Sequence, residues 1–230
     1  MFVGILMKEL YNKILANEWI DWVETSNPNG TREKEIFPFI KNWIEKLKPK
    51  IVGDIGCGQG SCSKLLNDSI QYIGIDSSST LIKRAKKLYS SPNKKFVKGD
   101  VYNLPLENES IDAIISLWVW SHLDNLQLAA KEMYRVLNTK GRFLIITANP
   151  ETYEERKTFY KDYTTQGNLL TGTFDLGNGK TLTNTTLYLR SKKEIEESIK
   201  QAGLKINYVK RMGQAESSDK GLYLVIEGSK

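Results

Sequence analysis

The 230-residue sequence predicts a single α/β domain, with room for a small insertion, built on a mainly parallel β-sheet. Two observations predict this class. From Ile51 onward, short apolar runs alternate with helical patterns, which is typical of βαβ units. A glycine-rich turn, residues 56–60, follows the first apolar run and precedes a predicted helix, as in folds that bind nucleotides.

The apolar runs are short and bounded by turn residues, so each predicts a strand. These strands cover residues 51–55, 72–75, 95–97, 111–117, 142–147, 205–210 and 222–227. Helices are expected between them, at 61–67, 78–89, 126–137 and 191–202. Ser191 and Glu194 have the spacing of a capping box, which favours a helix start there. Gly141 and Gly203 lie where helices are expected to stop.

Two segments depart from this alternation. Residues 1–50 predict helices, with Pro28-Asn29-Gly30 as a turn between them. Residues 149–190 are polar, contain aromatic side chains and include "DLGNGKTL", which is typical of a hairpin turn. Because ligands of open α/β sheets bind beyond the carboxyl ends of the strands, both segments could reach the ligand. We therefore expect an N-terminal helical lid (1–50), a core (51–148 and 191–230) and a lid or substrate-pocket insert (149–190).

The residues around the glycine turn carry the functional signal. "IVGDIGCGQG" has the spacing G-x-G-x-G, which is neither the dinucleotide pattern nor a Walker pattern. Asp76 closes the second predicted strand, where an acid can accept hydrogen bonds from ribose hydroxyls. Asp100 follows the third predicted strand, where a carboxylate can accept from an adenine amino group. Each acid alone is more often a helix cap or a turn residue, but the glycine turn and the two acids in this order favour a nucleotide site.

These segments resemble the class I S-adenosylmethionine-dependent methyltransferase family, especially its small-molecule branch. The resemblance covers residues 51–150 and rests on "VGDIGCGQG", "YIGIDSS", "GDVYNLPLENESIDAIIS" and "MYRVLNTKGRFLIITANP". Gly53 replaces the Leu usual before the first acid. The resemblance implies a doubly wound, Rossmann-like sheet of seven mostly parallel strands, with the last strand antiparallel. It also implies S-adenosyl-L-methionine as the cofactor.

By this resemblance, the glycine turn would pass beneath the methionine part of the cofactor, with Asp54 orienting the turn or the amino group. Asp76 would hold the ribose, and Asp100 would pair with the adenine. The expected cofactor-binding residues are Asp54, Gly56, Cys57, Gly58, Gly60, Asp76, Ser77, Asp100, Val101, Ser116 and Leu117.

The sequence indicates the residues that would contact the methyl acceptor less clearly than those that would bind the cofactor. His122 is the only histidine, and its ordinary pKa near neutrality suits a general base, although a histidine here more often packs or caps the following helix beside the cofactor. Trp118 and Trp120 alternate after the fourth predicted strand, so one could face the cofactor and the other the core. The remaining candidates for substrate contact are Trp19, Trp22, Arg32, Trp118, Tyr153 and Tyr160. The tryptophans are as compatible with lid packing, and Arg32 with an exposed ion pair.

The resulting hypothesis is methyl transfer to an oxygen or nitrogen atom of a small molecule. A nucleic-acid or protein acceptor is the first alternative, although "SLWVWS" stands where amine-methylating nucleic-acid enzymes carry an Asn/Asp-Pro-Pro-aromatic turn. A short-chain dehydrogenase is suggested by Tyr153-x-x-x-Lys157, but its glycine motif is absent. A non-catalytic cofactor-binding domain is the third alternative, against which the intact acids argue.

Composition narrows the partners. The net charge of +6 could suggest a nucleic-acid partner, but the lysines are spread along the chain. The local basic run in the predicted helix at 78–89 is typical of a solvated helix face. The longest apolar stretches are far shorter than the roughly 20 residues that span a bilayer. "MFVGILMKEL" lacks the features of a signal peptide, and Cys57 and Cys62 suit neither a zinc site nor a disulfide scaffold, so we expect a cytoplasmic protein without a metal. The acceptor, the atom methylated and the oligomeric state stay open.

Overall fold

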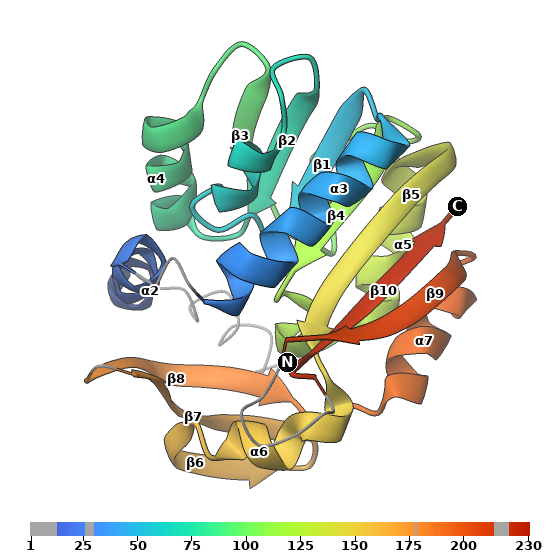
Figure 1. Cartoon of the computed structure of the whole chain (residues 1–230). Helices are drawn as coiled ribbons and strands as arrows, with labels where there is room; N and C mark the ends of the chain where they lie inside the picture. The colour runs from blue at the N-terminus through green and yellow to red at the C-terminus, as the bar shows by residue number, and fades with distance from the viewer. Residues whose placement is uncertain (1–12, 26–29, 178, 214–220) are drawn as a thin grey trace.

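The computed structural model describes residues 13–25, 30–177, 179–213 and 221–230. Its main body is a seven-stranded sheet in the order β3-β2-β1-β4-β5-β10-β9 (Figure 1). The strands are β1 (Ile51–Ile55), β2 (Gln71–Asp76), β3 (Lys94–Lys98), β4 (Ile111–Leu117), β5 (Leu137–Ala148), β9 (Lys205–Met212) and β10 (Tyr223–Ser229). The strand β10 runs antiparallel to both β5 and β9, and the other neighbouring pairs of this sheet are parallel. The expected fold class, including the antiparallel last strand, is confirmed.

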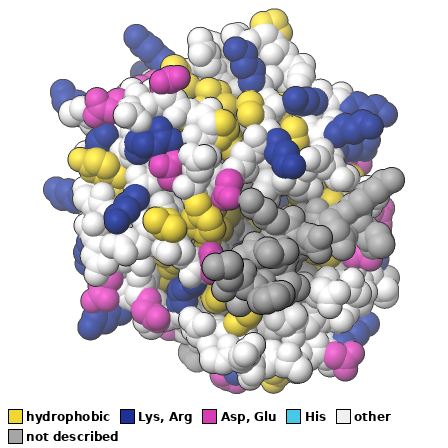
Figure 2. Space-filling model, turned by 180° about the vertical axis from the view of Figure 1, so that it is seen from behind, with side chains coloured by type: hydrophobic (Ala, Val, Ile, Leu, Met, Phe, Trp, Pro, Cys, Tyr) yellow, Lys and Arg dark blue, Asp and Glu magenta, His cyan; other side chains and the backbone are white. Residues whose placement is uncertain are grey.

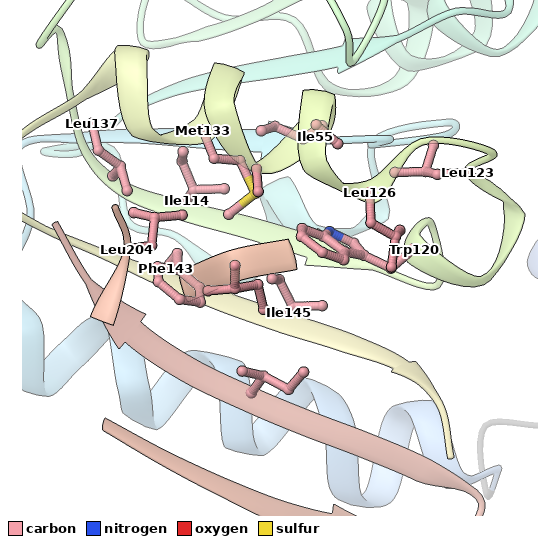
Figure 3. Close-up of a cluster of buried hydrophobic side chains, with 14 of the residues drawn as sticks. Ile55, Ile114, Trp120, Leu123, Leu126, Met133, Leu137, Phe143, Ile145 and Leu204 are labelled. Atoms are coloured by element: carbon pink, nitrogen blue, oxygen red, sulfur yellow. The ribbon is translucent and has the colours of Figure 1, made fainter. Parts of the chain in front are cut away.

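Helices cover both faces of this sheet, because side chains alternate between the faces along each strand. In β4, Ile114 packs against one face cluster and Ile115 against the other. One face carries α5 (Leu126–Val136) and α7 (Lys192–Gln201), and the contacts of Met133 and Leu126 of α5 are drawn in Figure 3. The opposite face carries α3 (Phe37–Leu47) and α4 (Ser79–Tyr89). The sheet is therefore buried on both sides, and ligand access is left to its edge.

The expected helices α4, α5 and α7 form close to their expected bounds. The capping box at Ser191 and Glu194 is present, and Gly203 (φ +91°) follows the end of α7. Gly141 does not end a helix as expected. The helix α5 ends at Val136, and Gly141 lies in an irregular part of β5, where a Cβ would come within 2.9 Å of the Asn138 carbonyl. The register between β4 and β5 shifts in this stretch, so Gly141 lies in a β-bulge.

The predicted helix at 61–67 is also different. Residues Ser61–Leu65 form the short 3-10 helix η2, and Leu66 is extended. The segment begins after Gly60 (φ +83°) without a side-chain cap, and Ser69 already bonds Asn67 in the following turn. The segment between Gly60 and the turn at Asn67 is therefore too short to form a stable α-helix.

The described part of the N-terminal region, residues 13–25 and 30–50, forms helices, as predicted. They are α2 (Lys13–Thr25), the π-helical turn η1 (Arg32–Ile36) and α3. The predicted turn at Pro28-Asn29-Gly30 lies outside the described residues except for Gly30, which is a bend. No helix of the described residues is long and apolar enough to cross a membrane.

Residues 149–190 contain a second, separate sheet. After η4 (Pro150–Thr152) and the short helix α6 (Tyr153–Lys157), the antiparallel strands β6 (Tyr160–Gln166), β7 (Leu169–Gly177) and β8 (Lys180–Tyr188) follow. Gly177 pairs with Lys180, which confirms the predicted hairpin. Buried side chains of this sheet form a small cluster with Ala148, apart from the two main clusters. We call β6–β8 the lid sheet. It lies below the carboxyl ends of the main strands in Figure 1.

Candidate active site

A cavity of about 800 Å³ lies at the carboxyl ends of β1, β2 and β4, between the main sheet and the lid sheet. The order of the sheet reverses between β1 and β4, and open α/β sheets bind their ligands at such a switch point. Nine of the expected cofactor residues line this cavity: Asp54, Gly56, Cys57, Gly58, Asp76, Ser77, Asp100, Val101 and Leu117. The cavity therefore gathers residues that lie up to 63 positions apart in the sequence.

Two expected cofactor residues do not line the cavity. Ser116 is fully buried, and its hydroxyl donates to the Ile55 carbonyl at 3.1 Å. Gly60 faces the core, because a Cβ there would come within 2.5 Å of the Phe96 ring. Both residues support the shape of the site from behind.

Three glycines of the turn adopt left-handed backbone angles, but they face different surroundings. A Cβ on Gly56 would overlap the Val119 side chain at 2.1 Å. A Cβ on Gly58 would meet only the Trp19 indole nitrogen, at 3.6 Å. Gly58 is therefore the glycine whose missing side chain leaves space on the cavity side of the turn.

Asp54 is completely buried at the cavity wall. Its Oδ2 accepts a hydrogen bond from the Tyr72 hydroxyl at 2.5 Å. Burial raises the pKa of this carboxyl to about 7, and the negative charge of Asp76 adds to the effect, while the Tyr72 hydrogen bond opposes it. A cation at Oδ1 would favour the ionised form.

Asp76 links two parts of the site. Its Oδ2 accepts from the Gly58 amide at 3.0 Å, and its Oδ1 accepts from the Ser78 amide at 2.8 Å. Burial raises the pKa of Asp76, although both amide hydrogen bonds lower it. The carboxylate thus holds the glycine turn in place and still has lone pairs for a ligand.

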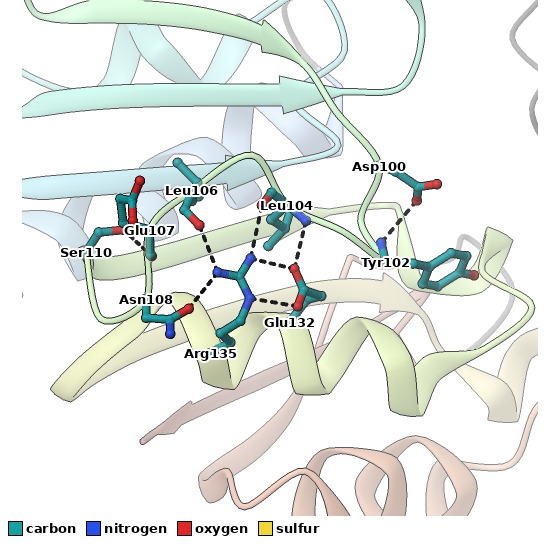
Figure 4. Close-up of polar contacts among 9 residues, drawn as sticks. All are labelled: Asp100, Tyr102, Leu104, Leu106, Glu107, Asn108, Ser110, Glu132 and Arg135. Carbon is teal, nitrogen blue, oxygen red and sulfur yellow. Dashed lines mark hydrogen bonds and ion pairs between the residues drawn. The ribbon is translucent and has the colours of Figure 1, made fainter.

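Asp100 begins a loop that a polar network holds against α5 (Figure 4). Asp100 itself accepts from the Tyr102 amide at 3.0 Å. Further along, Glu132 accepts from the Leu104 amide at 2.8 Å, and Arg135 donates to the Leu104 carbonyl at 3.0 Å. The Arg135–Glu132 ion pair anchors the loop that carries Asp100 and Val101.

His122 lines the cavity from η3 (Trp120–His122), and its Nδ1 lies 2.5 Å from the Thr186 carbonyl of β8. A carbonyl can only accept, so Nδ1 carries the proton and Nε2 keeps its lone pair. Burial lowers the pKa of His122, and the nearby charge of Arg156 lowers it further. The neutral ring is thus set up as a proton acceptor.

Aromatic side chains join the N-terminal helix to the core around the cavity. Trp19 lies 5.1 Å from Trp22 and, edge to face, 6.4 Å from Trp118. Trp118 stacks at 5.6 Å on Tyr223. All four line the cavity, whereas Trp120 is buried in the core, as the alternation predicted. Trp118 has φ +61°, an uncommon angle for a bulky residue that marks strain at a site.

The helix α2 and the lid sheet contact each other across the cavity mouth. Lys180 of β8 pairs with Asp21 of α2 at 2.5 Å and donates to Thr25 at 3.0 Å. On its other side, α2 pairs with α4 through Glu24 and Arg84. The cover of the cavity is therefore built from both non-core segments.

The other acceptor candidates differ in position. Tyr160 and Arg32 line the cavity, and Arg32 is paired with Glu33 at 2.5 Å. Tyr153 lies outside the lining: its hydroxyl donates to the Tyr188 carbonyl at 3.2 Å. Lys157 is paired with Glu154 at 2.6 Å, so Tyr153 and Lys157 do not form a dehydrogenase pair.

Sequence reasoning missed Arg156, Gln59 and Tyr223, which also line the cavity. Gln59 lies within the glycine turn, whereas Arg156 and Tyr223 belong to no motif and only the fold brings these two to the cavity. Four buried polar atoms of the cavity lining have no hydrogen-bond partner among the described residues: Asp54 Oδ1, Gln59 Nε2, Trp118 Nε1 and Arg156 Nε. Such atoms indicate a ligand with complementary groups. The described residues contain no cluster of three or more His, Cys, Asp or Glu side chains that could hold a metal ion.

Comparisons with known proteins agree with this geometry. Residues 53–145 match the model of the methyltransferase domain family. The chain is 27% identical over 174 residues to a demethylmenaquinone methyltransferase of Thermotoga maritima, covering 72% of this chain and 74% of that protein. It is 29% identical over 117 residues to a malonyl-[acyl-carrier protein] O-methyltransferase of Legionella pneumophila, and 32% identical over 117 residues to a probable tRNA methyltransferase 9B of Bos taurus.

These last two matches cover 49% of this chain but only 41% and 25% of the relatives. Among solved structures, an S-adenosylmethionine-dependent methyltransferase of Clostridium acetobutylicum superposes with a TM-score of 0.70 at 15% identity, covering 95% of this chain and 98% of that one. The chain therefore contains a methyltransferase domain, matched over residues 53–145, and its fold is the one seen in S-adenosylmethionine-dependent methyltransferases.

Proposed function

We propose that this protein transfers a methyl group from S-adenosylmethionine to an oxygen or nitrogen atom of a small molecule bound in the same cavity. The observation that carries the proposal is that one cavity has the family's cofactor residues on the sheet side and His122 with the lid sheet on the other. Cofactor and acceptor can therefore meet without bulk water.

The residues of the cavity fit this cofactor. The unpartnered Oδ1 of Asp54 suits an ammonium group, and the open side of Gly58 leaves space for the methionine part. Asp76, at the end of β2, would accept from the ribose hydroxyls. Asp100 and Val101, on the anchored loop, would pair with the adenine.

The cofactor supplies an activated methyl group, so the chain has to orient the acceptor and remove a proton where one is released. The aromatic wall of Trp19, Trp118 and Tyr223 excludes water and orients a flat or apolar acceptor. His122 Nε2 would take the proton from a hydroxyl or ammonium group, and the Thr186 carbonyl keeps the required tautomer.

Three observations support a small acceptor over the alternatives. The cavity is covered by α2 and the lid sheet, as a small-molecule enzyme requires and a binding module does not. On the face shown in Figure 2, Lys and Arg side chains are scattered among acidic and apolar ones and form no continuous basic stripe for nucleic acid. The names of the relatives give three different acceptors, so the acceptor has to be found by experiment.

The test has two steps. Calorimetry should first show binding of S-adenosylmethionine and of its demethylated product, with NADH as the negative control. The protein is then incubated with the cofactor and pools of small acids, phenols and amines, and with bulk tRNA, and products are found by a mass increase of one methyl group. Binding of NADH without binding of S-adenosylmethionine would overturn the proposal, and methylation of tRNA alone would overturn the small-molecule acceptor.

A further inference from the structure

Arg156 is a partly buried cation on the acceptor side of the cavity. It comes from α6 and lines the cavity together with Tyr160. Its Nη2 donates to the Leu222 carbonyl, and its guanidinium lies 5.1 Å from the centre of the Tyr223 ring. Its Nε is buried and has no hydrogen-bond partner among the described residues. One of its polar groups is therefore unsatisfied.

Arg156 also lacks the counter-charge that most arginines of this chain have. Arg84, Arg135, Arg142 and Arg211 each form an ion pair with a glutamate. Within the described part of the chain, Arg156 forms an ion pair with no Asp or Glu, and its contacts are the Leu222 carbonyl and the Tyr223 side chain. A partly buried charge with a buried, unsatisfied Nε is unfavourable, so an anion is expected to complete this site.

The surroundings of Arg156 define the rest of the ligand. The lid sheet contributes four apolar side chains to the cavity lining: Phe174, Leu176, Leu182 and Leu187. With the Tyr160 and Tyr223 rings, they form an apolar chamber beside the guanidinium. A chamber of this kind accommodates an apolar or aromatic body and one charged group.

We propose that the methyl acceptor is an organic acid with an apolar or aromatic body, whose carboxylate binds Arg156 while the body lies under the lid sheet. This inference rests on the proposed function and narrows its acceptor class.

Arg156 also lies close enough to His122 for its charge to lower the pKa of the imidazole. A carboxylate on Arg156 would therefore be bound near the proposed base. If a hydroxyl of the acid is methylated, its oxygen forms the bond to the methyl carbon, the carbon–sulfur bond breaks with its electrons left on sulfur, and the proton moves to Nε2. If a carboxylate oxygen is methylated, a methyl ester forms and no proton is released.

The test compares acids with neutral compounds of the same shape. The protein, saturated with the demethylated cofactor product, is titrated by calorimetry with phenylacetate and phenylacetamide, and with octanoate and octanamide. We expect the acids to bind the wild type at least about tenfold more tightly than the amides, since a charge-assisted pair replaces a neutral one. Arg156→Gln should remove this preference, and Arg156→Lys should keep part of it.

Arg190→Gln is the matched control. Arg190 is buried, lies 4.4 Å from the Tyr188 ring and has an unpartnered Nη1, but it does not line the cavity. It should keep the preference for acids. Equal affinity for acids and amides, or an unchanged preference in a folded Arg156→Gln protein, would overturn the inference. Cofactor binding is measured separately on each variant, so failure of the methyltransferase function is distinguished from failure of the acid site.

Discussion

The carboxylate of Asp76 accepts a hydrogen bond from the backbone amide of Gly58 at 3.0 Å, which joins the end of β2 to the glycine turn after β1. The sequence places both residues at the cofactor but does not show that they are bonded to each other. Asp76 is therefore both a candidate ribose ligand and a part of the turn's structure. Substitution of Asp76 should therefore weaken cofactor binding both by removing the ribose contact and by loosening the glycine turn.

Asp76→Ala should weaken cofactor binding by about 1.5–3 kcal/mol or more, because the ribose hydroxyls lose an ionised acceptor. Asp76→Asn should lose less, because its amide oxygen can still accept from the Gly58 amide. Calorimetry with S-adenosylmethionine measures both. If folded Asp76→Ala binds the cofactor with wild-type affinity, Asp76 does not belong to the site.

Gly58→Ala and Gly60→Ala form a matched pair, because both glycines have positive φ and both variants carry a similar backbone strain of about 1–2 kcal/mol. At Gly58 the new methyl group has space on the cavity side, so cofactor affinity should fall more than thermal stability does. At Gly60 it would overlap Phe96, so thermal stability should fall more. Melting curves measure the thermal stability of both variants, and calorimetry measures their cofactor affinity. The prediction would be contradicted if the same variant showed the larger loss in both measurements.

The contrast between these glycines shows what the sequence could predict. The strand, the glycine turn and the two later acids follow one another in a fixed local order, so they were predictable. Whether a given glycine faces a ligand or a core ring depends on Phe96, 36 positions after Gly60, and no local pattern contains that information.

Errors in the secondary structure have a similar cause. The predicted helix at 61–67 was too long, because one helical turn between Gly60 and Asn67 can also form a 3-10 turn. Gly141 resembled a helix stop, but pairing with β4 extends β5 back to Leu137, directly after α5. Arg156 carried no signal at all, since an arginine in a polar stretch is ordinarily exposed. Tyr223 contacts Arg156 because β10 pairs with β5 in the folded sheet.

Cofactor affinity should depend on pH through Asp54. Burial raises the pKa of its carboxyl to about 7, so the free protein holds it mostly protonated at pH 5.5. An ammonium ligand needs the ionised form, and its own amino group stays charged in this range. Affinity for S-adenosylmethionine should therefore fall by about tenfold or more between pH 7 and pH 5.5. In Asp54→Asn, calorimetry should find weaker binding at pH 7 and little change with pH.

The stability of the cofactor-free protein gives an independent check on Asp54. The folded-state pKa lies above the unfolded value, so this carboxyl binds its proton more tightly in the folded state, and its effect on stability becomes unfavourable as the pH rises from about 4 to 7. Asp54→Asn should thus unfold at a higher temperature than the wild type at pH 8 and at a similar one near pH 4. A lower melting temperature at pH 8 would contradict the raised pKa.

His122→Asn tests the proposed base. The Asn amide can still donate to the Thr186 carbonyl but has no lone pair in place of Nε2. With a hydroxyl acceptor, kcat should fall by about 10²–10⁴ while cofactor affinity is kept. The wild-type rate should be lost only at acidic pH, because burial places the pKa of His122 below its ordinary value. An unchanged kcat in the variant would remove His122 as the base.

The lid sheet should control transfer but not cofactor binding. Its buried residues form their own small cluster with Ala148, and the two main clusters do not depend on them, so the core should fold without it. None of the expected cofactor residues belongs to β6, β7 or β8, whereas Tyr160, Phe174, Leu182 and Leu187 line the acceptor side.

We therefore expect a variant with residues 158–188 replaced by a short glycine-serine linker to bind S-adenosylmethionine and to transfer no methyl group. Lys180→Ala serves as the mild control. Its ion pair with Asp21 is largely exposed and contributes at most about 1 kcal/mol, so most activity should remain. Calorimetry and product mass are measured on both proteins. Full transfer by the folded variant without the lid sheet would show that the acceptor is bound by the core alone, and the aromatic and apolar chamber would then have no part in choosing it.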